Sequence, residues 1–166
     1  MKNLIAIPVL ALAVMLQTAV ISRISLLTGT ADLVLLIVVT WALQEQVESA
    51  WHWALVGGVL VSFVSALPPI VPIAGYLLAV GLARFVVRQI WQSPMLALLS
   101  VTFFATLVYN LLTYLVLLVV GSPLPLGDVL ALILLPSIFL NFLLAIPVHS
   151  LIRDLASWVY PLEEMA

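Results

Sequence analysis

The chain has 166 residues and a formal net charge of −2; 66% of its residues are hydrophobic and only 7% are charged. A soluble domain carries about a quarter charged residues, so this composition, with a mean hydropathy of +1.36, excludes a protein whose surface faces mainly water. The lack of a basic surplus argues against nucleic acid as a partner, and the lack of cysteine excludes disulfides and thiolate metal sites.

Apolar segments follow one another along the whole chain. A helix needs about 20 residues to cross a hydrocarbon core roughly 30 Å thick, so the length accommodates about five or six spans. We predict an all-α, polytopic membrane helix bundle with six transmembrane helices, forming a single integral membrane domain over residues 1–166. The predicted spans are 4–21, 33–43, 50–67, 73–87, 94–120 and 128–150, followed by a short cytoplasmic tail at 151–166.

Three of these spans have individual features. The first follows Lys2 and is interpreted as a retained helix, because further apolar spans follow it instead of a soluble region. The second is short for a full crossing, so we expect it to be tilted or shielded by neighbours. The third is interrupted by Pro68, Pro69 and Pro72, because proline removes a backbone donor and clashes with the preceding turn.

The few basic residues predict the orientation of the bundle, because Lys and Arg in short loops concentrate on the cytoplasmic side. With six spans and an inside N-terminus, the inside residues are Lys2, Arg84, Arg88 and Arg153, and only Arg23 lies outside. Both termini are therefore predicted to be cytoplasmic.

Tryptophans gather at the predicted cytoplasmic helix ends, where indole rings prefer the headgroup level. Together with two arginines they form a predicted cytoplasmic rim, which comprises Trp41, Trp51, Trp53, Arg84, Arg88, Trp91 and Trp158. Anchoring at the membrane interface is the simpler interpretation of this rim, and a docking surface for a partner is the alternative.

Small residues recur at every fourth position of the third span and reappear in the fourth. They are Ala54, Gly58, Ser62 and Ala66 in the third span, and Gly75, Ala79 and Ala83 in the fourth. This spacing places them along one helix face and lets another backbone approach closely. We expect the two spans to pack through these faces, with a partner's helix as the alternative.

A polar stripe follows one side of the fifth span. Its residues are Thr102, Thr106, Tyr109, Asn110 and Thr113, and Asn141 lies at a similar depth on the sixth span. In lipid such groups turn inward and find partners, so we expect Asn110 and Asn141 to bond each other or a neighbouring carbonyl. Structural bonding inside the bundle is the simpler interpretation, and a ligand cavity or a transmembrane partner is the alternative.

Ionisable residues indicate function when they are buried in a membrane, but here they are expected at helix ends and turns. They are Arg23, Asp32, Glu45, Glu48, Asp128, Arg153 and Asp154, and Arg84 is expected to extend to the inner interface. His52 and His149 have no metal-ligand spacing, and no nucleophile with an adjacent base is found. We expect no catalytic, metal or cofactor site, and we predict that the protein is not an enzyme.

The order of these features resembles the MreD family of the rod-shape cell-wall elongation machinery. The resemblance begins at Gln17 and includes Asp32 at the start of an aliphatic run to Val39, and the Gly75–Tyr76 pair. It ends with the segment 141–147, near the end of the sixth span. The family often has an aspartate late in the third span, where this chain has Ser62 and Ser65.

The resemblance implies a non-catalytic scaffold in the bacterial plasma membrane, with MreC, a single-span membrane protein, as its partner. It also implies association with the glycosyltransferase RodA, a class B penicillin-binding protein and the actin-like MreB. The family's fold is similar to the substrate-binding S subunits of energy-coupling-factor transporters, so a small-molecule-binding S-type subunit is the alternative. A channel or secondary transporter ranks last, because the prolines lie at a helix junction instead of in mid-span.

Overall fold

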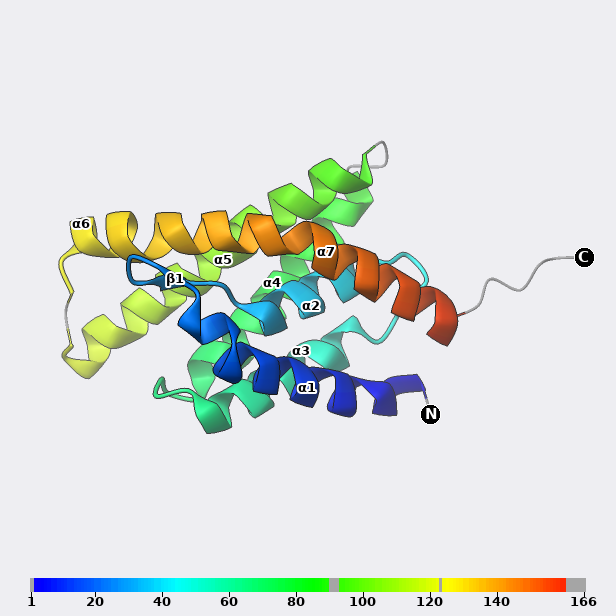
Figure 1. The fold of residues 1–166 in the computed structure, drawn as a ribbon, viewed down its shortest axis with the longest axis horizontal. Coiled ribbons are helices and arrows are strands. Elements are labelled where there is room, and N and C mark those ends of the chain that lie inside the picture. The colour runs from blue at the N-terminus through cyan, green and yellow to red at the C-terminus, as the bar shows by residue number, and fades with distance from the viewer. Residues whose placement is uncertain (1, 90–92, 123, 161–166) are drawn as a thin grey trace, which may run out of the picture.

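The computed structural model describes residues 2–89, 93–122 and 124–160 and consists of helices with one small hairpin (Figure 1). The α-helices are α1 (Ala6–Ala19), α2 (Leu33–Ala42), α3 (Ala50–Val64), α4 (Ile70–Gln89), α5 (Pro94–Val120), α6 (Leu126–Asp128) and α7 (Leu135–Val159). Short 3₁₀ segments are η1 (Lys2–Ile5) and η2 (Ile21–Arg23), and a π-helical segment, η3 (Val129–Leu134), joins α6 to α7. Strands β1 (Ser25–Leu26) and β2 (Gly29–Thr30) pair antiparallel.

Within the described residues, four helical segments are long and apolar enough to cross a membrane: Ala6–Arg23, Ile70–Val87, Pro94–Val120 and Leu126–Val159. The prediction of an all-α membrane bundle is thereby confirmed, whereas six crossings with cytoplasmic termini remain a prediction. Both ends of the described chain lie at one end of the bundle, and the β-hairpin lies at the other (Figure 1). We call these the terminal end and the hairpin end.

Helix α2 is the centre of the bundle. Its residues from Val34 to Ala42 are all buried, and it contacts α1, α3, α4, α5 and α7. At 1.5 Å per residue it is only about 15 Å long. The expectation that neighbours shield this short helix is confirmed, and its N-terminus consequently lies inside the bundle.

Several boundaries differ from the predicted ones. Helix α3 ends at Val64, because Ser65 has an extended backbone. Helix α4 already begins at Ile70, since Pro72 falls in its first turn, where a backbone donor is not needed. Helix α7 continues to Val159, so residues 151–159 are helical instead of forming the predicted tail.

The predicted small-residue faces bring α3 and α4 together at one point. A Cβ atom on Gly58 would lie 2.6 Å from the Cα atom of Ile73, so only glycine permits this approach. Gly75 instead faces α5, because a Cβ atom there would lie 2.5 Å from the Tyr109 ring. The face therefore serves two neighbours of α4 instead of α3 alone.

The remaining members of these faces are divided between interior and surface. Ala54, Ala79 and Ala83 are fully buried. Ser62 is only partly exposed and donates a hydrogen bond to the Val59 carbonyl of its own helix. Ala66 lies beyond the end of α3 and is exposed, so its predicted place on the packing face is wrong.

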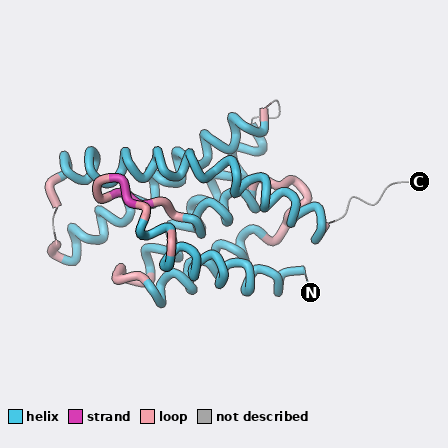
Figure 2. The backbone as a smooth tube through the Cα atoms, in the orientation of Figure 1, coloured by secondary structure: helices cyan, strands magenta, loops and turns pink. Residues whose placement is uncertain are grey.

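A proline in α7 attaches the hairpin to the bundle. Pro136 has no N–H to donate to the Leu132 carbonyl four residues earlier. That carbonyl instead accepts from the backbone N–H of Thr28 at 3.2 Å and from its hydroxyl at 2.8 Å. Gly29 lies against the same segment, since a Cβ atom there would be 2.7 Å from the Ile133 carbonyl oxygen. The hairpin, magenta in Figure 2, therefore covers this end of the bundle.

Candidate functional site: a polar cavity at the hairpin end

A cavity of about 320 Å³ lies between the hairpin and the N-terminus of α2. Its walls come from the end of α1, the hairpin segment, the end of α3, the middle of α5 and the start of α7. Most of its polar lining consists of hydroxyl and carboxamide groups, and Asp32 contributes a carboxylate. Because α2 is short, this polar space extends into the bundle.

Asp32 is the N-cap of α2 and accepts hydrogen bonds from two elements. Its Oδ1 accepts from the backbone N–H of Leu35 at 2.9 Å, which satisfies a donor that a helix start leaves unpaired. The Tyr76 hydroxyl of α4 donates to the same carboxylate, at 3.1 Å to Oδ1 and 2.9 Å to Oδ2. The carboxylate thus connects the start of α2 to a fully buried side chain of α4.

Carboxamides extend this network to the other helices. The backbone N–H of Asp32 donates to Asn141 Oδ1 of α7 at 2.9 Å, and Asn141 Nδ2 donates to Thr106 Oγ1 of α5 at 2.9 Å. Gln17 Oε1 of α1 accepts from the backbone N–H of Val34 at 3.0 Å. Polar contacts at the N-terminus of α2 therefore join α1, α2, α4, α5 and α7.

The cavity is electronegative in character. Among the described residues that line it, none is a lysine or an arginine, and Asp32 is its carboxylate. The groups that donate to that carboxylate, which are the Tyr76 phenol, the Gln17 carboxamide and two backbone amides, are neutral. Tyr109 also lines the cavity, and its ring stacks on that of Tyr76 with centroids 5.5 Å apart. Such a site suits a cationic or hydrogen-bonding group better than an anion.

The predicted polar stripe lies partly in this cavity. Its lining members are Thr106, Tyr109, Asn110, Thr113 and Asn141. Thr102 lies outside the lining and is buried.

The expected bond between the two asparagines is not present. Asn110 Nδ2 donates to the Thr106 carbonyl of its own helix at 2.9 Å, whereas Asn141 binds Thr106 Oγ1 and the Asp32 backbone. Asn110 is part of the cavity wall and Asn141 is part of the network that joins the helices.

Sequence reasoning missed the centre of the site. Asp32 was expected to be a solvated charge at a helix end, but it is partly buried and bonded to Tyr76. An aspartate immediately before an unbroken aliphatic run is the signal for a helix N-cap. Nothing local indicates that Tyr76 donates to it, because the two residues are 44 positions apart.

The predicted cytoplasmic rim is only partly correct. Trp41 and Trp53 are fully buried and stack on each other with centroids 4.0 Å apart, because both lie on inward faces of α2 and α3. Trp51 and Trp158 are exposed, as an interfacial position requires. Trp91 and the side chain of Arg88 lie outside the described residues.

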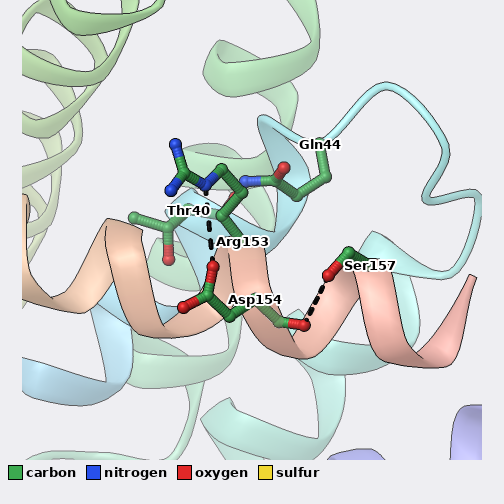
Figure 3. A network of polar contacts seen from close by, with 5 residues as sticks. All are labelled: Thr40, Gln44, Arg153, Asp154 and Ser157. Carbon is green, nitrogen blue, oxygen red and sulfur yellow. Dashed lines mark hydrogen bonds and ion pairs between the residues drawn. The ribbon is translucent and has the colours of Figure 1, made fainter.

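The terminal end carries several charged groups. Arg84 donates a hydrogen bond to the Val47 carbonyl in the turn between α2 and α3. Arg153 and Asp154 form an exposed pair at 3.8 Å on α7 (Figure 3). Ser157 donates to the Asp154 carbonyl, and Gln44 lies close by. Exposed pairs of this kind contribute little to stability. Their main effect is to make this end of the bundle hydrophilic.

An apolar groove runs between α1 and α7 on the outside of the bundle. Its volume is about 250 Å³, and its lining consists entirely of apolar side chains: Val9, Leu12, Ala13, Leu16, Leu33, Ile37, Val148, Leu151, Ile152 and Leu155. Ala13 is 2% exposed at its floor, whereas Leu12 and Leu151 are 59% and 70% exposed at its edges. The groove is thus a concave surface that would face lipid.

No family model, no curated protein and no solved structure matches this chain. Across residues 2–89, 93–122 and 124–160, no group of three His, Cys, Asp or Glu side chains could hold a metal ion.

Proposed function

We propose that this chain is a non-catalytic scaffold subunit of a bacterial cell-elongation (rod) complex in the plasma membrane. The resemblance to the MreD family supports the proposal, since Asp32 and Asn141, which begin two of the resembling segments, meet at one network. In this role the chain binds an MreC-like single-span protein and associates with RodA, a class B penicillin-binding protein and MreB.

The apolar groove between α1 and α7 is the observation that carries this proposal. In lipid, helices associate through close packing, because the lipid tails are as apolar as the side chains. Ala13 at the floor of the groove has a small side chain, and exposed leucines stand at the edges. A surface of this shape lets another helix approach closely. The groove therefore suits a single apolar helix of a partner, and binding such a helix requires no catalytic group.

Site-specific photocrosslinking in cells tests the groove. A photoreactive phenylalanine analogue replaces Leu12 or Leu151 at the groove edges, or Leu115 on α5 as a matched control. Leu115 is 50% exposed and lies outside the groove. We expect both groove positions to form an adduct with a coexpressed MreC-like protein, and Leu115 to form little.

Equal crosslinking at the three positions, or adducts with lipid alone at the groove, would contradict the scaffold proposal. Purification of the tagged protein in mild detergent, followed by mass spectrometry, gives a second readout. Recovery of the single-span partner without an ATPase module supports the scaffold.

The polar cavity favours one alternative, a small-molecule-binding S-type subunit of an energy-coupling-factor transporter. Its volume of about 320 Å³ falls at the lower end of small-molecule sites, roughly 300–1,000 Å³. Co-purification with an energising ATPase module and a stoichiometric vitamin-like ligand would support this alternative and contradict the scaffold.

A further inference from the structure

We propose that the polar cavity binds a zwitterionic ammonium–phosphate head group, as found in phosphatidylethanolamine, with the ammonium at Asp32 and the phosphate at the mouth. This inference goes beyond the scaffold function and uses none of the groove residues.

The charge of Asp32 points to a cation. A carboxylate has about four lone-pair positions, and the groups that donate to Asp32 are all neutral: the Leu35 N–H, the Tyr76 hydroxyl, the Gln17 carboxamide and the Val34 N–H. An ionised group inside a membrane protein is costly unless it is paired, and no described lysine or arginine lines this cavity. An ammonium group supplies the positive charge that these neutral donors do not.

The neighbouring side chains suit the same group. Tyr109 lines the cavity beside Asp32, and an aromatic ring attracts a cation through its electronegative face. The Asn110 carboxamide and the Thr113 hydroxyl, one and four residues further along α5, add acceptor oxygens. The interior of the cavity therefore combines a carboxylate, an aromatic ring and neutral acceptors.

The mouth favours a phosphate and lipid. Arg23 is exposed and is the next residue along the chain after Ser22, which lines the cavity. A guanidinium is a preferred partner of a phosphate. The adjoining segments expose large apolar side chains: Leu27 is 65% exposed and Phe63 is 81% exposed. Acyl chains would lie against these residues while the head group enters.

Native mass spectrometry of the purified full-length protein in mild detergent tests the proposal. The probes are phosphatidylethanolamine, phosphatidylglycerol and the soluble glycerophosphoethanolamine. We expect phosphatidylethanolamine to be retained at least about tenfold better than phosphatidylglycerol, which lacks the ammonium, as the loss of one charged hydrogen bond predicts. Equal retention of the two lipids, or retention of neither, would overturn the proposal.

The variant Asp32→Asn removes the charge but keeps the cap, because asparagine is as good an N-cap as aspartate. We expect it to lose roughly tenfold in phosphatidylethanolamine retention. The matched control is Asp128→Asn, an exposed carboxylate on α6 outside the cavity, which should retain the lipid normally. Unchanged retention in Asp32→Asn, or an equal loss in the control, contradicts the proposal.

A second variant protects the test against misfolding. Asn110→Leu leaves the Asp32 network intact, because the Asn110 side chain bonds only the Thr106 carbonyl in that region. The substitution removes a polar group from the cavity wall, so retention of phosphatidylethanolamine should fall several-fold. The unfolding temperature should stay close to that of the parent protein. If the soluble head group binds as tightly as the lipid, the cavity recognises the ammonium group but its ligand is a soluble molecule and not a lipid. If Asn110→Leu retains phosphatidylethanolamine as well as the parent does, the lipid binds somewhere other than this cavity.

Discussion

A single carboxylate organises the interior of an otherwise apolar chain. Asp32 caps α2, accepts from Tyr76 and presents its backbone N–H to Asn141. Buried polar groups in a membrane protein have no water to bond, so an unpaired one is costly. Several of the buried polar residues, among them Thr106 and Asn141, meet where a short helix begins inside the structure.

The hydroxyl of Tyr76 provides a test at this scale. Tyr76→Phe removes the donor to Asp32 while the ring and its stacking on Tyr109 remain. We expect a loss of roughly 1 kcal/mol in the free energy of unfolding, the usual contribution of one such hydrogen bond. Thermal unfolding of the purified protein in detergent measures it as a lower transition temperature.

The matched control is Tyr114→Phe, because Tyr114 is partly exposed on α5 and lies outside the cavity. If the two variants unfold at the same temperature, the Tyr76–Asp32 bond does not stabilise the bundle.

The closest contacts between helices are made at glycines, which have no side chain. Gly58 brings α3 against the backbone of α4 at Ile73, and Gly75 accommodates the ring of Tyr109 from α5. Van der Waals packing is the main attraction between helices in lipid, so these close approaches hold the elements in register. The same spacing of small residues does not operate over the whole predicted face, since Ala66 lies outside the helix.

Gly58→Ala tests the close approach. The new Cβ atom would lie 2.6 Å from a backbone atom of Ile73, and a backbone atom cannot move without shifting α4. We expect destabilisation of about 1–3 kcal/mol, as for other overpacked sites, measured by thermal unfolding in detergent.

Gly81→Ala is the control on α4, because its Cβ would meet only the Trp51 ring at 3.7 Å. It should be neutral or slightly stabilising, since alanine favours helix by up to about 1 kcal/mol over glycine. A comparable loss of stability in both variants would mean that a general effect of the added methyl group, and not the contact with Ile73, explains the result.

The molecule as a whole has two unlike ends. The hairpin end contains the polar cavity and exposes apolar loop residues, whereas the terminal end has the Arg153–Asp154 pair and the Arg84 contact with the α2–α3 turn. Between them the surface is apolar and includes the α1–α7 groove. This division matches a bundle that crosses the bilayer, with a polar cavity at one end.

The predicted orientation can be tested because the natural chain has no cysteine. Ser25→Cys in β1 and Ser157→Cys in α7 replace exposed residues at opposite ends. With cytoplasmic termini, we expect a membrane-impermeant maleimide to label Ser25→Cys in intact cells and Ser157→Cys only after permeabilisation. The opposite labelling pattern would invert the topology, and labelling of both in intact cells would contradict a spanning bundle.

The sequence by itself determined the class of this protein. Composition and the repeated apolar runs indicated an all-α membrane bundle, and Pro68, Pro69 and Pro72 indicated the junction between the third and fourth helices, because both signals are local. The short second span and its shielding also followed from length alone. The polar stripe on α5 was recognised residue by residue, although its function was left open.

Only the tertiary structure decided which of these residues meet. Asp32, Tyr76, Thr106 and Asn141 come from four helices, and their hydrogen bonds join positions up to 109 residues apart. It also showed that Trp41 and Trp53 stack in the interior instead of facing the headgroups. In an almost uniformly apolar chain every helix face resembles a lipid-facing one, so burial depends on how the helices pack against one another, and local sequence carries little information about that.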